Sequence, residues 1–252
     1  MPYDARFYDT YSDESRRSAE AFAAVLMREL APRSVLDVGC GVGTWLRAFA
    51  DAGAATVVGV DGPHVDPGQL LVPADRFVAR DLTRPLRLPD ALPQSFDLAV
   101  SMEVGEHLPD SASRTLVRSL TARAPAVLFS AAIPHQGGTD HVNERWQRYW
   151  ATRFADEGFQ PVDRFKAELW ESSTVAYYYV QNALLYVRRD RLAELPGLQR
   201  YTVDPEDPAL DRVHPRKWLE AHDPRRQPLR RVLRALPHAV RAAVGRRLGW
   251  VQ

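Results

Sequence analysis

The chain has 252 residues, of which 45% are hydrophobic, and a formal net charge of +1 at pH 7. A sizeable core can therefore form, and no apolar run approaches the roughly 20 residues of a membrane-spanning helix. The single cysteine, Cys40, excludes a disulfide framework, and the first residues lack the pattern of a secretory signal, so we expect a cytoplasmic protein. The balanced charge gives no global argument for nucleic acid as a partner.

Strand and helix patterns alternate along most of the chain. In chain order, the expected elements are a helix at 12–30, a strand at 34–38, a helix at 44–52, strands at 56–60, 77–80 and 96–101, a helix at 111–122, a strand at 126–131 and a helix at 146–157. Runs at 159–169 and 183–188 predict a closing antiparallel strand pair. This order is typical of an α/β fold with a doubly wound, mostly parallel sheet.

Residues 35–44 combine a buried strand, a glycine-rich turn and a helix start. Gly39, Gly41 and Gly43 remove the Cβ atoms where the chain turns tightly, which lets a ligand approach the main chain. Asp61 ends the next predicted strand, where open α/β sheets place a carboxylate on a ribose diol. The stretch therefore predicts a site for a nucleotide-containing cofactor.

The glycine spacing is G-x-G-x-G, with Asp37 two residues before the first glycine. An acid at this position would repel the pyrophosphate of a dinucleotide, but it suits a cofactor with an ammonium group and a sulfonium. With these residues the chain resembles the class I S-adenosylmethionine (SAM) dependent methyltransferases, whose first motif reads [D/E]-x-G-x-G-x-G. The resemblance implies SAM as cofactor and the Rossmann-like methyltransferase fold with a seven-stranded sheet.

The same resemblance places the acid after the third strand near the adenine, which here is Asp81 with Leu82. A turn-capping role for Asp81 fits equally well, and for Asp97 capping is the favoured interpretation. The N-terminal segment, residues 7–11, can fold over the cofactor or pack on the first helix. The residues expected to bind SAM are Asp37, Gly39, Gly41, Gly43, Asp61, Gly62, Asp81, Leu82, Ser101, Glu103 and Tyr11.

A second motif, residues 101–109, follows the fourth predicted strand and places three ionisable groups at the carboxyl edge of the sheet. His141 follows the fifth strand and faces the same edge. Mixed oxygen and nitrogen groups suit a divalent cation. The E-x-x-E-H pattern is similar to that of small-RNA 2′-O-methyltransferases and ubiquinone-pathway O-methyltransferases, and this similarity implies Mg²⁺ or Mn²⁺ held by Glu103, Glu106, His107 and His141.

His107 and His141 are the expected catalytic residues, with or without a metal. A hydroxyl is a poor nucleophile at neutral pH, so either an imidazole removes its proton or a cation lowers its pKa. The loop at 133–138 and the tyrosine-rich tract at 170–182 are the expected acceptor-binding segments, although the tract can equally be a packed helix. Hydroxyls and amides beside aromatic rings suit a sugar or a polyhydroxylated natural product.

We therefore expect a SAM-dependent methyltransferase that modifies a hydroxyl of a small polar acceptor, either a sugar or a natural-product intermediate. The alternatives are an RNA ribose 2′-O-methyltransferase with a metal-assisted site and an N-methyltransferase of an amino sugar. The glycine spacing and Asp37 disfavour an NAD(P) oxidoreductase. A non-catalytic SAM-binding protein is disfavoured because its motifs would be eroded, and these are intact.

The expected organisation is a methyltransferase domain at 1–195 and a Pro- and Arg-rich, partly helical extension at 196–252. Residues 225–247 hold eight arginines, and Arg230, Arg231 and Arg234 alternate with apolar residues as in an amphipathic basic helix. Such a helix can pack on the domain or on a second subunit of a homodimer. Peripheral contact with an anionic membrane comes next, and nucleic-acid binding is the least favoured.

Overall fold

The computed structural model describes residues 5–223 together with residues 225, 229, 233, 236, 237, 240 and 241, and it describes side chains from Asp13 onward. The chain divides into two compact units, Met1–Arg212 and Val213–Gln252.

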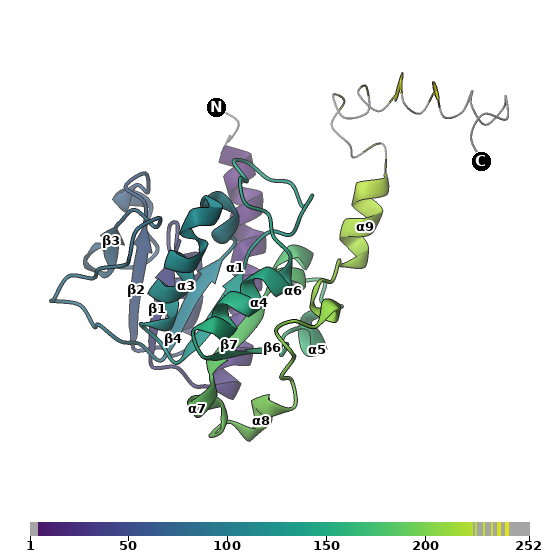
Figure 1. Cartoon of the computed structure of the whole chain (residues 1–252). Coiled ribbons are helices and arrows are strands. Elements are labelled where there is room, and N and C mark those ends of the chain that lie inside the picture. Colours follow the sequence, from purple (N-terminus) through teal and green to yellow (C-terminus); the bar gives the residue numbers. More distant parts are fainter. Residues whose placement is uncertain are drawn as a thin grey trace. The chain divides into compact units, whose positions relative to one another are not determined.

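The first unit is built on a seven-stranded sheet with the order β3-β2-β1-β4-β5-β7-β6 (Figure 1). The strands from β1 to β5 run parallel, and β7 is antiparallel to both of its neighbours, β5 and β6. Their bounds are β1 Ser34–Val38, β2 Thr56–Asp61, β3 Phe77–Ala79, β4 Leu98–Met102, β5 Ala126–Ser130, β6 Phe159–Val162 and β7 Leu184–Arg188. The expected sheet, including its closing antiparallel pair, is confirmed.

Helices cover both faces of this sheet (Figure 1). The α-helices of the first unit are α1 Ala5–Glu29, α2 Thr44–Asp51, α3 Ser113–Thr121, α4 Gln147–Asp156, α5 Lys166–Leu169, α6 Tyr177–Asn182, α7 Arg189–Leu192 and α8 Pro196–Gln199. α1 and α2 pack on one face and α3 and α4 on the other, so strand residues alternate between two cores, as Val35 and Leu36 do. This burial on both sides explains the continuous apolar runs in the sequence.

The segment expected as one long strand at 159–169 is shorter than predicted, because β6 ends at Val162. Residues Lys166–Leu169 form the helix α5 instead, and the ring of Phe165 packs in the core against Phe22 of α1 with ring centroids 4.5 Å apart. This part of the sequence prediction was wrong. The first helix is longer than expected, since α1 begins at Ala5 rather than near residue 12.

Residues after 195 still pack on the sheet. Leu198 and Leu210 are buried, and Thr202 forms an antiparallel bridge with Val162. The first compact unit therefore ends at Arg212, beyond the expected domain boundary at residue 195. In the second unit the helix α9 spans Pro215–His222. Arg230, Arg231 and Arg234 lie outside the described residues. Within the part of the chain that is described, none of the helices combines the length and apolarity needed to cross a membrane.

Candidate active site

The glycine-rich turn between β1 and α2 uses its glycines for different reasons. Gly39 has a φ of +86°, and its N–H donates to the carbonyl of Val60 over 2.8 Å. A Cβ on Gly39 would lie 2.2 Å from Cγ2 of Val104, so this position also demands a close approach of two loops. A Cβ on Gly41, with a φ of +52°, would meet nothing within 4 Å. Gly39 thus serves packing, whereas Gly41 leaves open space above the turn.

Asp61 lies at the carboxyl end of β2 and joins this turn to the next loop. Its Oδ2 accepts a hydrogen bond from the N–H of Gly41, and its Oδ1 accepts one from the N–H of Gly62, both over 2.6 Å. Only 9% of the residue is exposed. The carboxylate is therefore held in one orientation at the edge of the sheet where open α/β folds bind their ligands.

A cavity of about 690 Å³ opens beside this carboxylate, above the carboxyl ends of the parallel strands. It is lined by these residues of the predicted site: Gly39, Asp61, Gly62, Asp81, Leu82, Glu103 and His107. Pro63, expected with Gly62 to shape the loop under the adenine, also lines the cavity. The lining further includes residues to which the sequence analysis gave no role: His64, Arg80, Val104 and Leu108. Each of these is a close neighbour of a predicted residue in a loop after a strand, which is the signal that could have identified them.

Two further predicted cofactor residues lie beneath the cavity rather than in its lining. Asp37 is 2% exposed, and its Oδ2 has no hydrogen-bond partner among the residues that the structure describes. Burial, reinforced by the charge of Asp61, raises the pKa of Asp37 well above the usual range. Ser101 is fully buried, and its hydroxyl donates to the carbonyl of Val38 over 2.8 Å, so it ties β4 to β1. Gly43 precedes α2 with a φ of 91°, and the side chain of Tyr11 lies outside the described residues.

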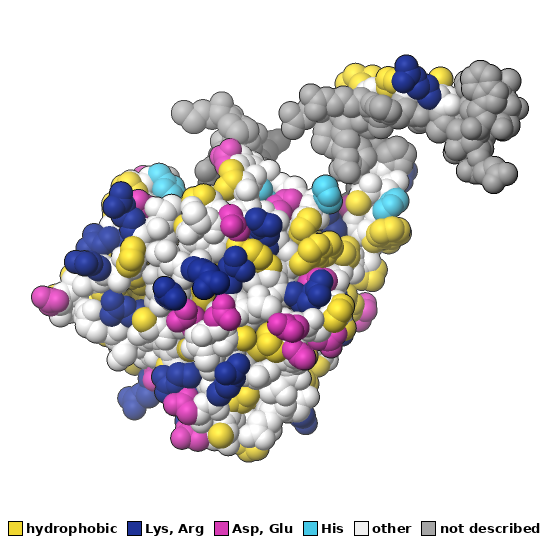
Figure 2. Space-filling view, viewed as in Figure 1, with side chains coloured by type: hydrophobic (Ala, Val, Ile, Leu, Met, Phe, Trp, Pro, Cys, Tyr) yellow, Lys and Arg dark blue, Asp and Glu magenta, His cyan; other side chains and the backbone are white. Residues whose placement is uncertain are grey.

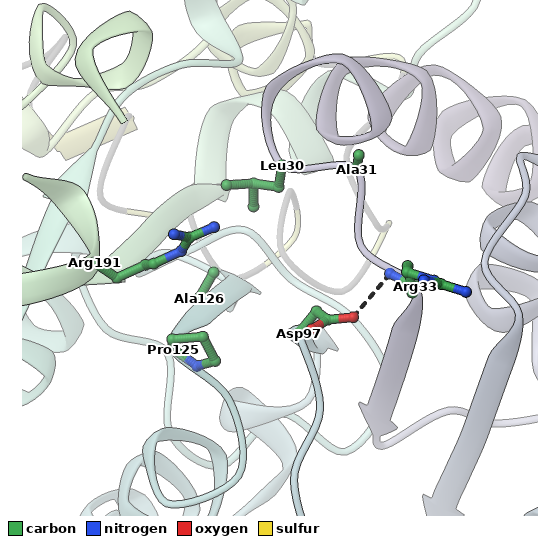
Figure 3. A pocket seen from close by; sticks show the side chains of 7 residues that line it. All are labelled: Leu30, Ala31, Arg33, Asp97, Pro125, Ala126 and Arg191. Carbon is green, nitrogen blue, oxygen red and sulfur yellow. Dashed lines mark hydrogen bonds between the residues drawn. The ribbon is translucent and has the colours of Figure 1, made fainter. Parts of the chain in front are cut away.

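Asp81 and Asp97, which had competing interpretations, both accept hydrogen bonds from the backbone. Oδ1 of Asp81 accepts hydrogen bonds from the backbone N–H and the hydroxyl of Thr83, and these bonds lower the pKa of Asp81. Because Asp81 also lines the cavity, its capping and binding roles are compatible. Figure 3 shows Asp97 beside a separate cavity of about 240 Å³, where its Oδ2 accepts from the N–H of Arg33 over 2.9 Å. The capping interpretation of Asp97 is confirmed.

Glu103 connects three segments that are distant in the sequence. Its carboxylate accepts hydrogen bonds from Nε2 of Gln136 over 2.8 Å and from Nδ2 of Asn182 over 3.0 Å. Its own N–H donates to the carbonyl of Ser130, and its φ of 55° is unfavourable for a residue with a side chain. Several bonds thus hold a strained residue beside the cavity. Sequence reasoning assigned Gln136 and Asn182 to acceptor-binding segments but missed this connection.

Three of the four predicted metal ligands come together. Glu106, His107 and His141 each offer a ligand atom, and these atoms all lie within 4.8 Å of one another. Glu103 is outside this group, because its carboxylate is held by the two amides. Neither carboxyl oxygen of Glu106 has a hydrogen-bond partner among the described residues, and burial, followed by the charge of Glu103, raises its pKa. Burial, followed by His141, lowers the pKa of His107.

Glu144 orients His141 and closes the loop after β5, a role that the sequence analysis did not assign. It accepts hydrogen bonds from the N–H groups of His135 and Gly137, and its Oε1 lies 3.0 Å from Nδ1 of His141. The sequence signal for the pairing of Glu144 with His141 was their separation by three residues in a glycine-rich loop. The loop also needs Gly138, where a Cβ would lie 2.2 Å from Nε2 of His141.

Comparisons with known proteins agree with this geometry. The family model described as a methyltransferase domain matches residues 11–170. Malonyl-[acyl-carrier protein] O-methyltransferase of Pseudescherichia vulneris is 33% identical over 165 residues, which are 61% of either chain. Ubiquinone biosynthesis O-methyltransferase of Neisseria meningitidis serogroup C is 35% identical over 109 residues, 42% of this chain and 46% of the relative. The matched regions therefore cover less than two thirds of these curated relatives.

The fold is also that of solved structures. Magnesium protoporphyrin IX methyltransferase from Synechocystis PCC 6803 with bound SAM superposes with a TM-score of 0.50 at 20% identity, over 75% of this chain and 86% of the other. At this identity the similarity concerns the fold alone. The family model, however, spans more than half of the chain, and its match includes the glycine-rich turn and the cavity residues. The chain therefore belongs to the methyltransferase domain family.

Proposed function

We propose that this enzyme transfers the methyl group of SAM to a hydroxyl of a small polar acceptor, such as a sugar or a natural-product intermediate. The observation that carries the proposal is the position of His107, which lines the cavity while its ring lies 4.8 Å from the ring of His141. A proton acceptor thus lies at the rim of the cofactor cavity, and amide side chains capable of binding polar groups are close by at Glu103.

The residues around the cavity fit SAM. Open space above Gly41 and the fixed carboxylate of Asp61 suit a ribose diol, and Asp81 with Leu82 provides a polar and an apolar wall for the adenine. Oδ2 of Asp37 is buried without a partner among the described residues, and a cationic group bound beside it would favour the ionised carboxylate over the neutral form that burial favours. When bound, SAM supplies a methyl group already activated by its sulfonium.

What remains for the protein is to position the acceptor and remove its proton. The lowered pKa of His107 favours the neutral imidazole at neutral pH, which is the form that accepts a proton. Glu144 holds the ring of His141 through Nδ1, as carboxylates do for catalytic histidines. We assign His107 as the general base and His141 as its oriented neighbour.

The names of the relatives support oxygen as the methylated atom. The curated relatives are O-methyltransferases of malonyl-[acyl-carrier protein], of ubiquinone biosynthesis and of tocopherol. These acceptors differ widely, so they support the reaction type and do not identify the acceptor of this chain. The N-methylation of an amino sugar stays the alternative within the same fold.

A metal-assisted reaction, including the RNA ribose alternative, is the second candidate. The favouring observation is the pair of buried oxygens on Glu106, which lie beside two imidazoles and have no hydrogen-bond partner in the described part of the chain. Glu106, His107 and His141 would hold the cation, and Glu103 would not. A bound cation would lower the pKa of the acceptor hydroxyl.

The test begins with calorimetric titration of SAM and of its demethylated product. Labelled SAM is then incubated with glycosides, phenols, amino sugars and RNA, and mass spectrometry identifies the methylated atom. His107→Gln is expected to lower the rate of methyl transfer by about 10²–10⁴-fold. The matched control, His222→Gln in α9, should retain the rate. Failure to bind SAM, or a product methylated on nitrogen, would refute the proposal.

Chelation separates the two mechanisms. If activity survives exhaustive treatment with EDTA, the general-base mechanism stands. If activity disappears and Mg²⁺ or Mn²⁺ restores it, the metal-assisted mechanism replaces it. A homodimeric state and a cytoplasmic location stay predictions; sedimentation equilibrium tests the first and cell fractionation the second.

A further inference from the structure

The balanced net charge of the chain conceals two oppositely charged parts. Ten of the 33 Lys and Arg residues but only two of the 32 Asp and Glu residues fall within 213–252, which gives this segment a formal charge of +8. The remainder of the chain carries −7. The boundary of the basic segment coincides with the start of the second compact unit at Val213. The second unit therefore has an electrostatic character of its own.

The second unit also exposes large apolar side chains at helical spacing. Leu229, Leu233, Leu236 and Val240 are spaced by four, three and four residues, and their backbone is helical. They are 71%, 56%, 53% and 53% exposed, respectively. This spacing places the four side chains, here called the apolar stripe, on one side of a helix. Figure 2 shows that hydrophobic side chains predominate in the described portion of this segment.

A second helix of the same unit has similar features. In α9, Trp218 is 60% exposed and Leu219 is 68% exposed, and Arg216 and Lys217 directly precede them. Aromatic and aliphatic side chains beside basic residues are typical of helices that lie in the interface of a bilayer. Two helical segments of one unit thus combine basic residues with exposed apolar side chains.

The choice among possible partners follows from this combination. A nucleic acid would neutralise the arginines but would leave the apolar stripe in water. Among the described residues of the first unit, the large exposed hydrophobic side chains are Leu71, Val142 and Trp146, which lie in loops and not along one helix. A bilayer with anionic headgroups satisfies both properties, because it attracts the arginines and buries the leucines.

We propose that residues 213–252 form a peripheral anchor that binds the surface of bilayers containing anionic lipids. The basic side chains contact the headgroups, and the apolar stripe enters the boundary with the acyl chains. This anchor is independent of the proposed acceptor and does not require that the enzyme methylates a lipid.

The test measures sedimentation of the full-length protein with vesicles. The vesicles contain either phosphatidylcholine alone or phosphatidylcholine with phosphatidylglycerol. We expect binding to the anionic vesicles and none to the neutral ones. The combined substitution Arg230→Gln, Arg231→Gln and Arg234→Gln should weaken binding about a hundredfold, since each basic residue contributes about fivefold near such a surface. Leu233→Ser with Leu236→Ser should weaken it at least about tenfold.

A matched control removes the same charge elsewhere, by Arg16→Gln, Arg47→Gln and Arg118→Gln on exposed sites of the first unit. It should bind vesicles as the wild type does, and all variants should keep their affinity for SAM, which shows that they are folded. The proposal is overturned if anionic vesicles do not bind the protein or if the tail and control variants lose binding equally. It is also overturned if the tail variants only dissociate a dimer, or if the tail binds RNA but no vesicles.

Discussion

Replacing Gly39 by Ala tests the structural account of the cofactor turn most directly. The new Cβ would lie 2.2 Å from Cγ2 and 2.8 Å from Cγ1 of Val104, at a backbone φ of +86°. The left-handed conformation costs a residue with a Cβ about 1–2 kcal/mol. Overpacking a buried contact costs a further 1–3 kcal/mol or so. The free energy of unfolding should therefore fall by about 2–5 kcal/mol.

Gly158→Ala separates these two contributions. Gly158 has nearly the same φ, +85°, but a Cβ there would meet nothing within 4 Å. It lies between α4 and β6, and it is not part of the lining of the cofactor cavity. We expect this control to lose only about 1–2 kcal/mol and to bind SAM normally. The excess loss in Gly39→Ala then measures the clash with Val104.

The assay is urea unfolding at equilibrium, supported by thermal melting. At about 2–4 °C per kcal/mol for a chain of this size, Gly39→Ala should lower the melting temperature by about 4–20 °C and Gly158→Ala by about 2–8 °C. Adding Val104→Ala to Gly39→Ala should recover part of the loss, a favourable coupling between the two sites. Equal losses in the two glycine variants, or losses that simply add in the double variant, would refute the reasoning.

Three further predictions concern the site. Asp37→Asn should weaken binding of SAM about tenfold, the effect of ~1.4 kcal/mol, and weaken binding of the demethylated product less, because that product has lost the sulfonium but keeps its ammonium group; unchanged binding of SAM in calorimetry would contradict an electrostatic role. Ser101→Ala should lower stability by about 1–2 kcal/mol by removing the bond to Val38 without changing the dissociation constant of SAM, and a large change in that constant would restore Ser101 to the cofactor site. The pKa of His107 is lowered from 6.5, so kcat/KM should begin to decrease with acidification only below about pH 6.5. This decrease should be absent in His107→Gln. Protonation is unfavourable in the folded state, so stability should decrease as the pH falls from 6.5 through the lowered folded value; an acid limb at or above 6.5 would contradict the burial effect.

The sequence alone was sufficient to predict the features that depend on residues adjacent in the chain. Gly39, Gly41 and Gly43 all adopt positive φ angles, as a tight turn before a helix requires. Asp61 lies at the end of its strand because the apolar run before it must be buried. The order of strands and helices followed from the same local patterns, since short apolar runs between amphipathic segments have few arrangements other than a parallel sheet.

Only the tertiary structure decided which side chains meet. Glu103 pairs with Asn182 across 79 positions of sequence, and no local pattern encodes that pair. Ser101 was assigned to the cofactor but is fully buried, because helices cover both faces of β4. When both faces of a strand are buried, the sequence does not alternate between apolar and polar residues, so it does not show which way each side chain points. Residues 163–169 left the sheet because Phe165 and Leu169 fill the core beneath α1. Conformation near one residue depends on adjacent atoms, whereas contacts between distant residues depend on how all the elements pack together.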